Sequence, residues 1–356
     1  MKNKIITYSF ISFLLLFMIL GIGFKDKEIS YQERRKLATF PEANSSFFTN
    51  LDSYLSDQFP FRDSFRKIKG YTSNIVFRQK LSHNVFTSGN YLFQLDSSIN
   101  DKSVTHLLDK IKYIDDTYLT NQNVYFSMIP DKNYYLDEQV PKLDYNRLES
   151  LLKNNLPSNI DWIDLKDTLS LDSYYYTDIH WKQEKLEPVV RRLQNMMNLT
   201  STNFSTVKNE YYPFYGALYS RVASSINADT ITYLTNSSIS DAVVYNYEKK
   251  EIQPVYNKNY LNNVDSYDIF LSGATPLLII NNNSNNTGRE LILFRDSFGS
   301  SLSPLLIDNY SKITIIDLRY INSKLLSNIS NVTFNTATDV LFLYSIPIIN
   351  NSFTLK

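Results

Sequence analysis

Residues 290–299 read ELILFRDSFG, an apolar run that ends in a polar turn. The run over residues 290–294 has the length and composition of a buried strand, and a helix is predicted over residues 302–309. A second apolar run follows at residues 313–318. Short apolar runs separated by helices are what a parallel sheet covered on both faces requires. This stretch therefore predicts part of an α/β sheet.

The same alternation of helix and apolar run occurs elsewhere in the chain. Helices predicted over residues 104–118 and 145–154 each lead into such a run. The predicted strands are residues 124–129, 160–165, 290–294, 313–318 and 340–346. We therefore expect a three-layer α/β/α sandwich with about five parallel strands.

The pattern changes between about residues 200 and 288, where segments rich in Tyr, Asn and Ser predominate. Residues 231–234 and 242–247 have the composition of strands and predict an inserted β-rich subdomain. Residues 281–286, NNNSNN, are too polar to bury and predict a turn or loop that returns the chain to the central sheet.

The N-terminus predicts a membrane anchor. Lys2 and Lys4 precede an apolar run over residues 5–24, and about 20 helical residues span the roughly 30 Å of hydrocarbon in a bilayer. The run is longer than a typical secretory signal and ends without an A-x-A-like cleavage site. We interpret residues 1–28 as an uncleaved signal anchor with the lysines inside the cell and the rest of the chain outside. A buried core helix is the alternative.

Composition narrows the function classes. The chain has 36 Lys plus Arg and 36 Asp plus Glu among 356 residues, and this zero net charge gives no reason to expect a nucleic-acid partner. With no cysteine, disulfides, thiolate metal sites and a Cys nucleophile are excluded. The 27 tyrosines suit either a sugar-facing surface or an ordinary core. Residues 29–100 are predicted to form a helical arm, and residues 101–356 the α/β domain.

Ser297 is the candidate nucleophile. It follows a predicted strand and precedes a helix, so its hydroxyl lies at the sheet edge where open α/β sheets bind ligands. The helix N-terminus directs N–H groups and a positive dipole to the same place, which suits an intermediate that carries an oxyanion. Ordinary N-capping by Asp or Ser is the alternative.

A second motif lies at residues 174–181, YYYTDIHW, before a predicted amphipathic helix. Residues i and i+2 of an extended segment point the same way, so Asp178 can orient the ring of His180. An Asp-x-His metal-ligand pair and an inert surface histidine are the alternatives. The other histidines, His83 and His106, have no carboxylate at suggestive spacing and are interpreted as structural.

The second motif resembles the D-x-H-W signature of the DHHW family, relatives of the alginate O-acetylation proteins with an SGNH-hydrolase-like domain. Residues 295–298, RDSF, resemble the serine motif of that family. Further segments similar to the family are residues 33–38 with 40–41, 57–62, 129–133, 215–219 and 267–273. The resemblance extends over nearly the whole chain after the anchor.

The resemblance implies a Ser–His–Asp site in which Ser297 is the nucleophile, His180 the general base and Asp178 the residue that orients it. Ile179 departs from the histidine in the family name and should point away from the site, and Arg295 replaces the glycine usual before Asp-Ser. No asparagine matches the oxyanion hole of ordinary SGNH hydrolases. The backbone N–H of Ser297 should serve there, assisted by Gly273 or Lys132.

The resemblance also implies the function class. The first expectation is an O-acetyltransferase for a cell-surface or exported polysaccharide, working beside a multispanning membrane-bound O-acyltransferase. A carbohydrate esterase with the same three residues is the second, and a non-catalytic polysaccharide-binding or assembly protein is the third. No cofactor and no metal ion are expected.

Overall fold

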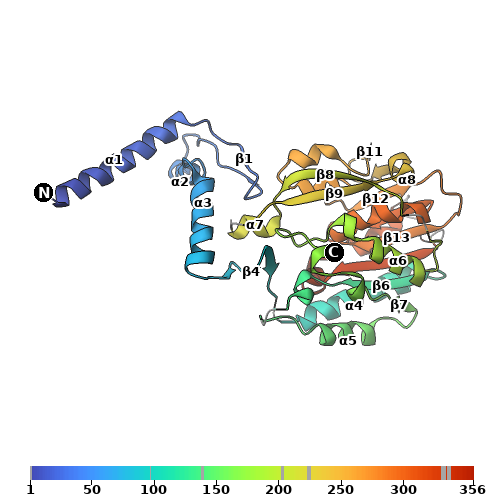
Figure 1. The fold of residues 1–356 in the computed structure, drawn as a ribbon. Coiled ribbons are helices and arrows are strands. Elements are labelled where there is room, and N and C mark those ends of the chain that lie inside the picture. The colour runs from blue at the N-terminus through green and yellow to red at the C-terminus, as the bar shows by residue number, and fades with distance from the viewer. Residues whose placement is uncertain are drawn as a thin grey trace.

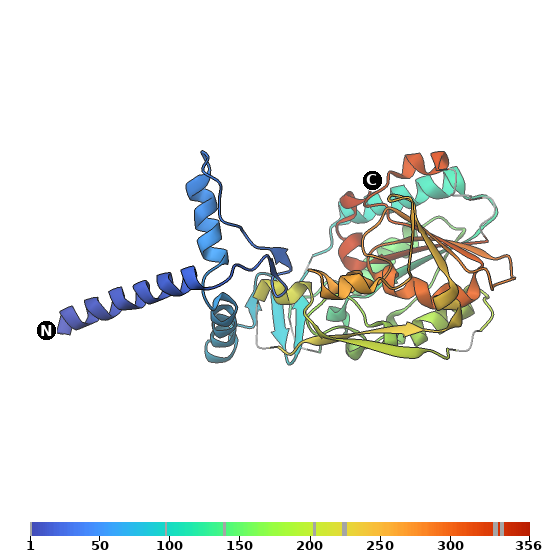
Figure 2. The ribbon, with the colours of Figure 1, turned by 90° about the horizontal axis from the view of Figure 1, so that it is seen from above.

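The computed structural model describes residues 2–96, 98–137, 140–201, 204–222, 226–329, 334 and 338–356. Three parts follow one another along the chain (Figure 1). Helix α1 (Lys2–Gly23) projects away from the rest, an arm of short helices and small strands follows it, and an α/β body contains the C-terminus. Figure 2 shows the same separation from above.

The body is built on a mixed sheet, eight-stranded within the described residues, in the order β11-β10-β12-β14-β13-β15-β6-β7. The parallel strands are β6 (Asn123–Ile129), β7 (Ile160–Trp162), β13 (Glu290–Arg295), β14 (Lys312–Ile316) and β15 (Asp339–Ser345). These are the strands predicted from the apolar runs. Their carboxyl ends meet at one edge of the sheet, and β13 delivers Ser297 to that edge.

Helices cover both faces of the sheet, as the α/β/α prediction requires. Along β13, Leu291 and Leu293 belong to one buried cluster, while Ile292 and Phe294 belong to another. The first cluster contains residues of α6 (Glu187–Met196) and α9 (Phe298–Leu302). The second contains residues of α4 (Asp101–Tyr118), α5 (Tyr145–Asn155) and α10 (Ile346–Ile349). Alternate side chains along the strand therefore pack into two separate cores, one on each face of the sheet.

The segment between residues 200 and 288 is β-rich, as predicted, but most of its strands extend the main sheet. Among the described residues of this segment, only β8 (Val207–Phe214) and β9 (Asp229–Thr235) form an antiparallel pair separate from the main sheet. Strands β10 (Val243–Asn246), β11 (Glu251–Gln253) and β12 (Leu277–Asn281) continue the sheet from β14 in antiparallel orientation. Strand β12 was not predicted. Its first four residues, all of them Leu or Ile, are buried within the sheet. Short helices α7 (Ala217–Val222) and α8 (Ser237–Asp241) lie in this segment.

The N-terminal region contains one long apolar helix, followed by an arm that mixes short helices with small strands where a helical arm was predicted. Residues Lys4–Gly21 of α1 have a mean hydropathy of 2.0, and none of that window is buried, so the helix is long and apolar enough to cross a membrane. The arm contains α2 (Phe47–Asp57), α3 (Arg62–Tyr71) and the small strands β1 (Ile29–Ser30) and β2 (Arg35–Lys36). Strands β3 (Leu81–Ser82), β4 (Val85–Ser88) and β5 (Tyr91–Gln94) form a small sheet between the arm and the body.

Candidate active site

Ser297 lies in the turn between β13 and α9, where the strand-to-helix pattern predicted it. The neighbouring Asp296 fixes this turn, because its carboxylate accepts hydrogen bonds from the N–H of Phe298 at 3.0 Å and of Ser345 at 2.8 Å. Asp296 is buried while Ser297 is partly exposed. The capping function therefore belongs to the aspartate, which leaves the serine hydroxyl free for another partner.

Arg295 occupies the position at which the resemblance implies a glycine, and its side chain is completely buried. Its guanidinium lies 3.4 Å from the carboxylate of Asp317 and donates to the carbonyl of Asp296. A Cβ added to Gly299 would lie 2.7 Å from the Cβ of Arg295. The side chain of Arg295 runs beneath the start of α9. The turn accommodates it because Gly299, the residue above it, has no Cβ.

The loop that carries Asp178 and His180 is folded back on itself between β7 and α6. Tyr174 and Trp181 form an antiparallel bridge, and the N–H of Tyr175 donates to the carbonyl of His180 at 3.1 Å. Residues 176–180 are bends rather than an extended strand. Asp178 and His180 lie close together, as predicted. A tight turn brings them together, however, and not the alternation of side chains along an extended strand.

Ser297, His180 and Asp178 form one continuous hydrogen-bonded chain. The Nε2 atom of His180 lies 2.8 Å from the Oγ of Ser297, and its Nδ1 lies 2.5 Å from Oδ1 of Asp178. The same Oδ1 accepts the backbone N–H of His180 at 3.0 Å. Both ring nitrogens are therefore engaged with protein groups, and the geometry is that of a nucleophile, a base and an orienting acid.

The second carboxylate oxygen of Asp178 is held from two other directions. It accepts the N–H of Ala217 at 2.7 Å and a guanidinium N–H of Arg34 at 3.3 Å. Burial opposes ionisation of this aspartate, but the interactions with His180, Arg34 and the N–H of Ala217 outweigh it. Together they hold the pKa of Asp178 well below its ordinary value, so the group is a fixed negative charge beside the imidazole.

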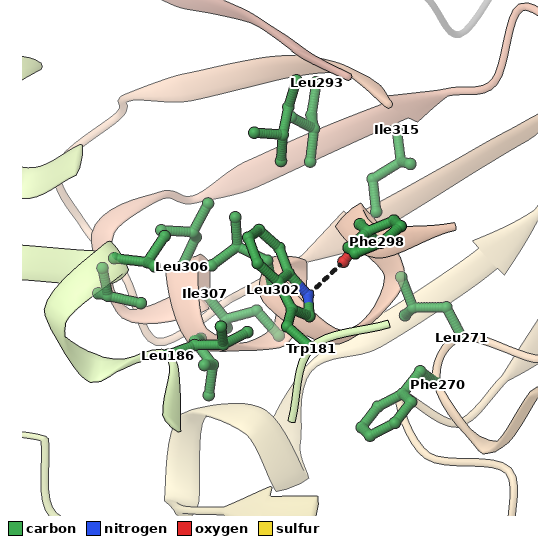
Figure 3. Packing of buried hydrophobic residues seen from close by; sticks show 14 of the residues in the cluster. Trp181, Leu186, Phe270, Leu271, Leu293, Phe298, Leu302, Leu306, Ile307 and Ile315 are labelled. Atoms are coloured by element: carbon green, nitrogen blue, oxygen red, sulfur yellow. Dashed lines mark hydrogen bonds between the residues drawn. The ribbon is translucent and has the colours of Figure 1, made fainter. Parts of the chain in front are cut away.

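Trp181 joins the two motifs directly. Its indole N–H donates to the carbonyl of Phe298 at 3.0 Å and to the hydroxyl of Ser301 at 2.9 Å. Figure 3 shows the indole among buried apolar side chains, with the bond to Phe298 dashed. Because Phe298 follows the serine and Trp181 follows the histidine, this contact fixes the distance between the two catalytic candidates.

Aromatic rings hold the imidazole in place. The ring of Tyr267 stacks on His180 with centroids 4.0 Å apart and planes 11° apart, and Phe298 contacts the imidazole at 4.7 Å. The hydroxyl of Tyr267 is hydrogen-bonded to Ser301 at 2.9 Å. Burial raises the pKa of Tyr267 above its ordinary value, so this ring remains a neutral platform for the imidazole.

Lys132 is buried and contacts the histidine loop rather than Ser297. Its ammonium donates to the carbonyls of Tyr175 at 2.9 Å and Asp178 at 2.6 Å. Burial lowers the pKa of Lys132 to about 7. Through these contacts Lys132 holds the histidine loop in place. They do not support the predicted contact of Lys132 with an oxyanion.

Gly273, the other residue predicted to assist the oxyanion, has a φ of +82°, which favours glycine. A Cβ here would lie 2.4 Å from a carboxylate oxygen of Asp268. The observed contact explains why glycine is needed at this position, and an oxyanion role for Gly273 stays a prediction. The N–H of Ser297 likewise stays the predicted principal donor.

The remaining histidines lie in other environments. His106 in α4 is hydrogen-bonded to Ser352 at 3.1 Å, and His83 follows β3 with its ring 2.9 Å from the hydroxyl of Ser82. Their observed partners are serines, in agreement with the structural interpretation.

Three residues of the site were not identified from the sequence as parts of it: Arg34, Tyr267 and Asp229. The carboxylate of Asp229 in β9 accepts the N–H groups of Tyr176 and Thr177 at 2.7 and 2.8 Å, and so anchors the histidine loop. Arg34 and Tyr267 lie in segments that resemble the DHHW family. That resemblance was the only signal that could have pointed to them.

Comparison with known proteins identifies the fold. No protein-family model matches the chain, and no curated protein sequence matches it significantly. A DHHW family protein from Eubacterium siraeum DSM 15702 superposes with a TM-score of 0.62 and 20% identity, over 76% of this chain and 92% of its own. Bacillus cereus PatB1 superposes with a TM-score of 0.60 and 16% identity, over 74% and 96% respectively. Another structure of PatB1, with a TM-score of 0.59, contains a sulfonyl adduct. The chain therefore has the α/β/α sandwich fold of a DHHW family protein and of PatB1.

Proposed function

We propose that the chain is an extracytoplasmic O-acetyltransferase-like enzyme that transfers acetyl groups to hydroxyls of a cell-surface or exported polysaccharide. The observation that carries the proposal is the hydrogen-bonded chain from Ser297 through His180 to Asp178, with contacts of 2.8 and 2.5 Å. The motifs that supply these residues resemble those of the DHHW family. A DHHW family protein with the same fold supports the interpretation.

The geometry suits a two-step acyl transfer. In the first step Ser297 Oγ attacks the carbonyl carbon of an acetyl donor while His180 Nε2 takes the hydroxyl proton, and the leaving group departs with that proton. In the second step a sugar hydroxyl attacks the acetyl-Ser297 ester and gives its proton to His180. The serine regains a proton from the imidazolium as the acetylated sugar leaves. Asp178 stabilises the imidazolium at both steps.

The apolar helix α1 supports a location at the membrane. We assign Lys4–Gly21 to the bilayer and the body to the extracytoplasmic side, because Lys2 and Lys4 favour an inside N-terminus. A multispanning membrane-bound O-acyltransferase is the proposed partner, since an extracytoplasmic enzyme needs acetyl groups delivered across the membrane.

Two measurements test the proposal. A sulfonyl fluoride probe should label Ser297 covalently, since activated serine hydroxyls react with this class of reagent, and a PatB1 structure contains a sulfonyl adduct. In the native host, Ser297→Ala should abolish the acetate that mild alkali releases from the polysaccharide. Ser150→Ala, at an exposed serine of α5, is the matched control and should change neither readout.

Each failure has a distinct meaning. Unchanged polymer acetylation with Ser297→Ala excludes the transferase function. Steady acetate release from a model ester, with no transfer to any sugar offered, indicates an esterase with the same three residues. Binding of polysaccharide without any labelling of Ser297 indicates a non-catalytic binding or assembly protein.

A further inference from the structure

Helix α3 exposes a row of large apolar side chains. Phe65 and Ile68, three residues apart on the helix, are 45 and 59% exposed, and Phe61, which precedes the first helical residue, is 52% exposed. Phe59, just before the helix, is also exposed. An apolar stripe of this kind is normally covered by another element or by a membrane.

Helix α2 also exposes large apolar side chains. Phe48 and Leu55, two helical turns apart, are 82 and 57% exposed, and no residue of α2 is buried. We call the exposed apolar side chains of the two helices and of the residues between them the arm face, namely Phe48, Leu55, Phe59, Phe61, Phe65 and Ile68.

The arm face is continuous with the apolar helix α1. The ring of Phe17, inside the Lys4–Gly21 window, stacks on Phe59 with centroids 5.3 Å apart and contacts Phe65 at 5.9 Å. A Cβ on Gly21 would lie 3.8 Å from Pro60. Phe17 lies one helical turn before the end of the window, which corresponds to about 6 Å along the axis. Phe59 and Phe65 therefore lie level with the outer margin of the apolar span.

The orientation of the helices fits a membrane surface. In Figure 1, α3 runs across the direction of α1, and in Figure 2 the other short blue helix, α2, also runs across it. When α1 crosses a bilayer, both arm helices then run closer to the bilayer plane than to its normal. This is the orientation of interfacial amphipathic helices, which bury their apolar face about 5–10 Å into the lipid boundary.

We propose that the arm face binds the outer surface of the lipid bilayer, so that the protein is attached by an interfacial platform as well as by α1. The proposal rests on membrane insertion of α1 but not on the catalytic function. A lipid surface is the occupant because the arm face continues the apolar surface of α1 through Phe17, Phe59 and Phe65. The exposed Lys69 follows one position after Ile68, so a cation lies beside the stripe where it can meet anionic headgroups.

The platform also has a direct connection to the catalytic candidates. Arg62 and Arg66 of α3 both pair with Glu33, Arg66 at 2.8 Å. The next residue along, Arg34, reaches the carboxylate of Asp178. The adjacent residues Glu33 and Arg34 thus connect helix α3, which carries part of the arm face, to Asp178. This connection holds the candidate site at a defined height above the lipid.

Single cysteines test the proposal cleanly, because the chain has none of its own. The full-length protein is reconstituted in phospholipid nanodiscs as one of four variants, Phe61→Cys, Phe65→Cys, Ile68→Cys or the exposed control Lys67→Cys. A membrane-impermeant maleimide should react at least tenfold more slowly with the first three variants than with the control. Equal rates for all four variants would overturn the proposal.

A fluorescence measurement identifies what covers the face. Both native tryptophans, Trp162 and Trp181, lie in the body. Phe65→Trp should be quenched by lipids that carry a quencher near the bilayer surface, whereas Ile252→Trp, 74% exposed on β11, should not. If the thiol of Phe65→Cys is protected while the indole of Phe65→Trp is not quenched, protein rather than lipid covers the face, and the proposal is wrong. Failure of Ser297 labelling would leave both readouts unchanged, so the two proposals fail separately.

Discussion

A guanidinium nitrogen of Arg34, in the N-terminal arm, lies 3.3 Å from a carboxylate oxygen of Asp178, in the loop that orients His180. The side chain of Arg34 is 13% exposed and that of Asp178 is 1% exposed. Arg34 also pairs with Asp265, two residues before the tyrosine that stacks on His180. The arm therefore supplies a cation to the candidate site, and we infer that Arg34 is a positioning residue.

Replacing Arg34 tests this relationship. Arg34→Gln should slow sulfonyl labelling of Ser297 about tenfold, because a lost hydrogen bond to a charged group costs roughly 1.5–3 kcal/mol and each 1.4 kcal/mol is a factor of ten. The pKa of Asp178 should rise, since Arg34 is one of the groups that lower it. The labelling rate is measured between pH 4 and 9.

Arg35→Gln is the matched control, because the neighbouring arginine pairs with Glu33 and Asp57 and not with the site. Arg34→Lys should restore part of the rate by returning the charge. Equal rates for the Arg34→Gln and Arg35→Gln variants would contradict the positioning role.

The two tryptophans give a paired prediction on stability. Trp181→Phe removes the donor to Phe298 and Ser301 and leaves a cavity, so the free energy of unfolding should fall by about 2–4 kcal/mol. Trp162→Phe should cost less, because that residue is only half-buried and its indole N–H has no partner within the described structure. Urea unfolding of both variants checks the difference. A larger loss for Trp162→Phe would refute the assigned role of Trp181.

Much of the sheet and of the site could be predicted from the sequence. The five parallel strands are buried on both faces, so each leaves a short apolar run between helices, and the run at residues 290–294 placed Ser297 at a sheet edge. The short spacing of Asp178 and His180 limited how far apart they could lie. Signals of this kind involve only residues that are close in sequence, so they can be recognised without knowledge of tertiary contacts.

Other parts depend on contacts that leave no local signal. Arg34 and Asp178 are 144 positions apart, and nothing around residue 34 indicates which acid it meets. Lys132 resembles a surface charge in sequence, yet it is buried because backbone carbonyls of the folded histidine loop surround its ammonium. Strand β12 lies in a segment dominated by Tyr, Asn and Ser, and this composition concealed a strand of the central sheet.

Acid should loosen the arm within a defined pH range. Hydrogen bonds from Arg35 lower the pKa of Asp57 from 3.8 to about 2. The N–H of Ala38 lowers this pKa further, while burial opposes the shift. A carboxyl group whose pKa is lower in the folded state contributes stability above about pH 4, and this is lost as the pH falls toward 2. Hydrogen–deuterium exchange of residues 25–77, corrected for the intrinsic rate, should show loss of protection between pH 4 and 2. Asp57→Asn should have weaker protection at pH 5 and a smaller further loss. The same acid response in both proteins would exclude Asp57 as its source.

Gly216 should be indispensable for the position of Asp178. A Cβ at this glycine would lie 2.2 Å from the Cβ of Asp178 and 2.5 Å from its Cα, so backbone must move and no rotamer relieves the contact. The neighbouring N–H of Ala217 would be displaced with it and would lose its 2.7 Å bond to Asp178. We expect Gly216→Ala to reduce labelling of Ser297 at least tenfold, together with a loss of stability that thermal unfolding measures. Gly23→Ala is the control, because a Cβ there meets nothing within 4 Å. A Gly216→Ala protein that folds and labels at the normal rate would mean that the Asp178 loop tolerates displacement, and the rigid orientation of His180 inferred from its contacts would then be wrong.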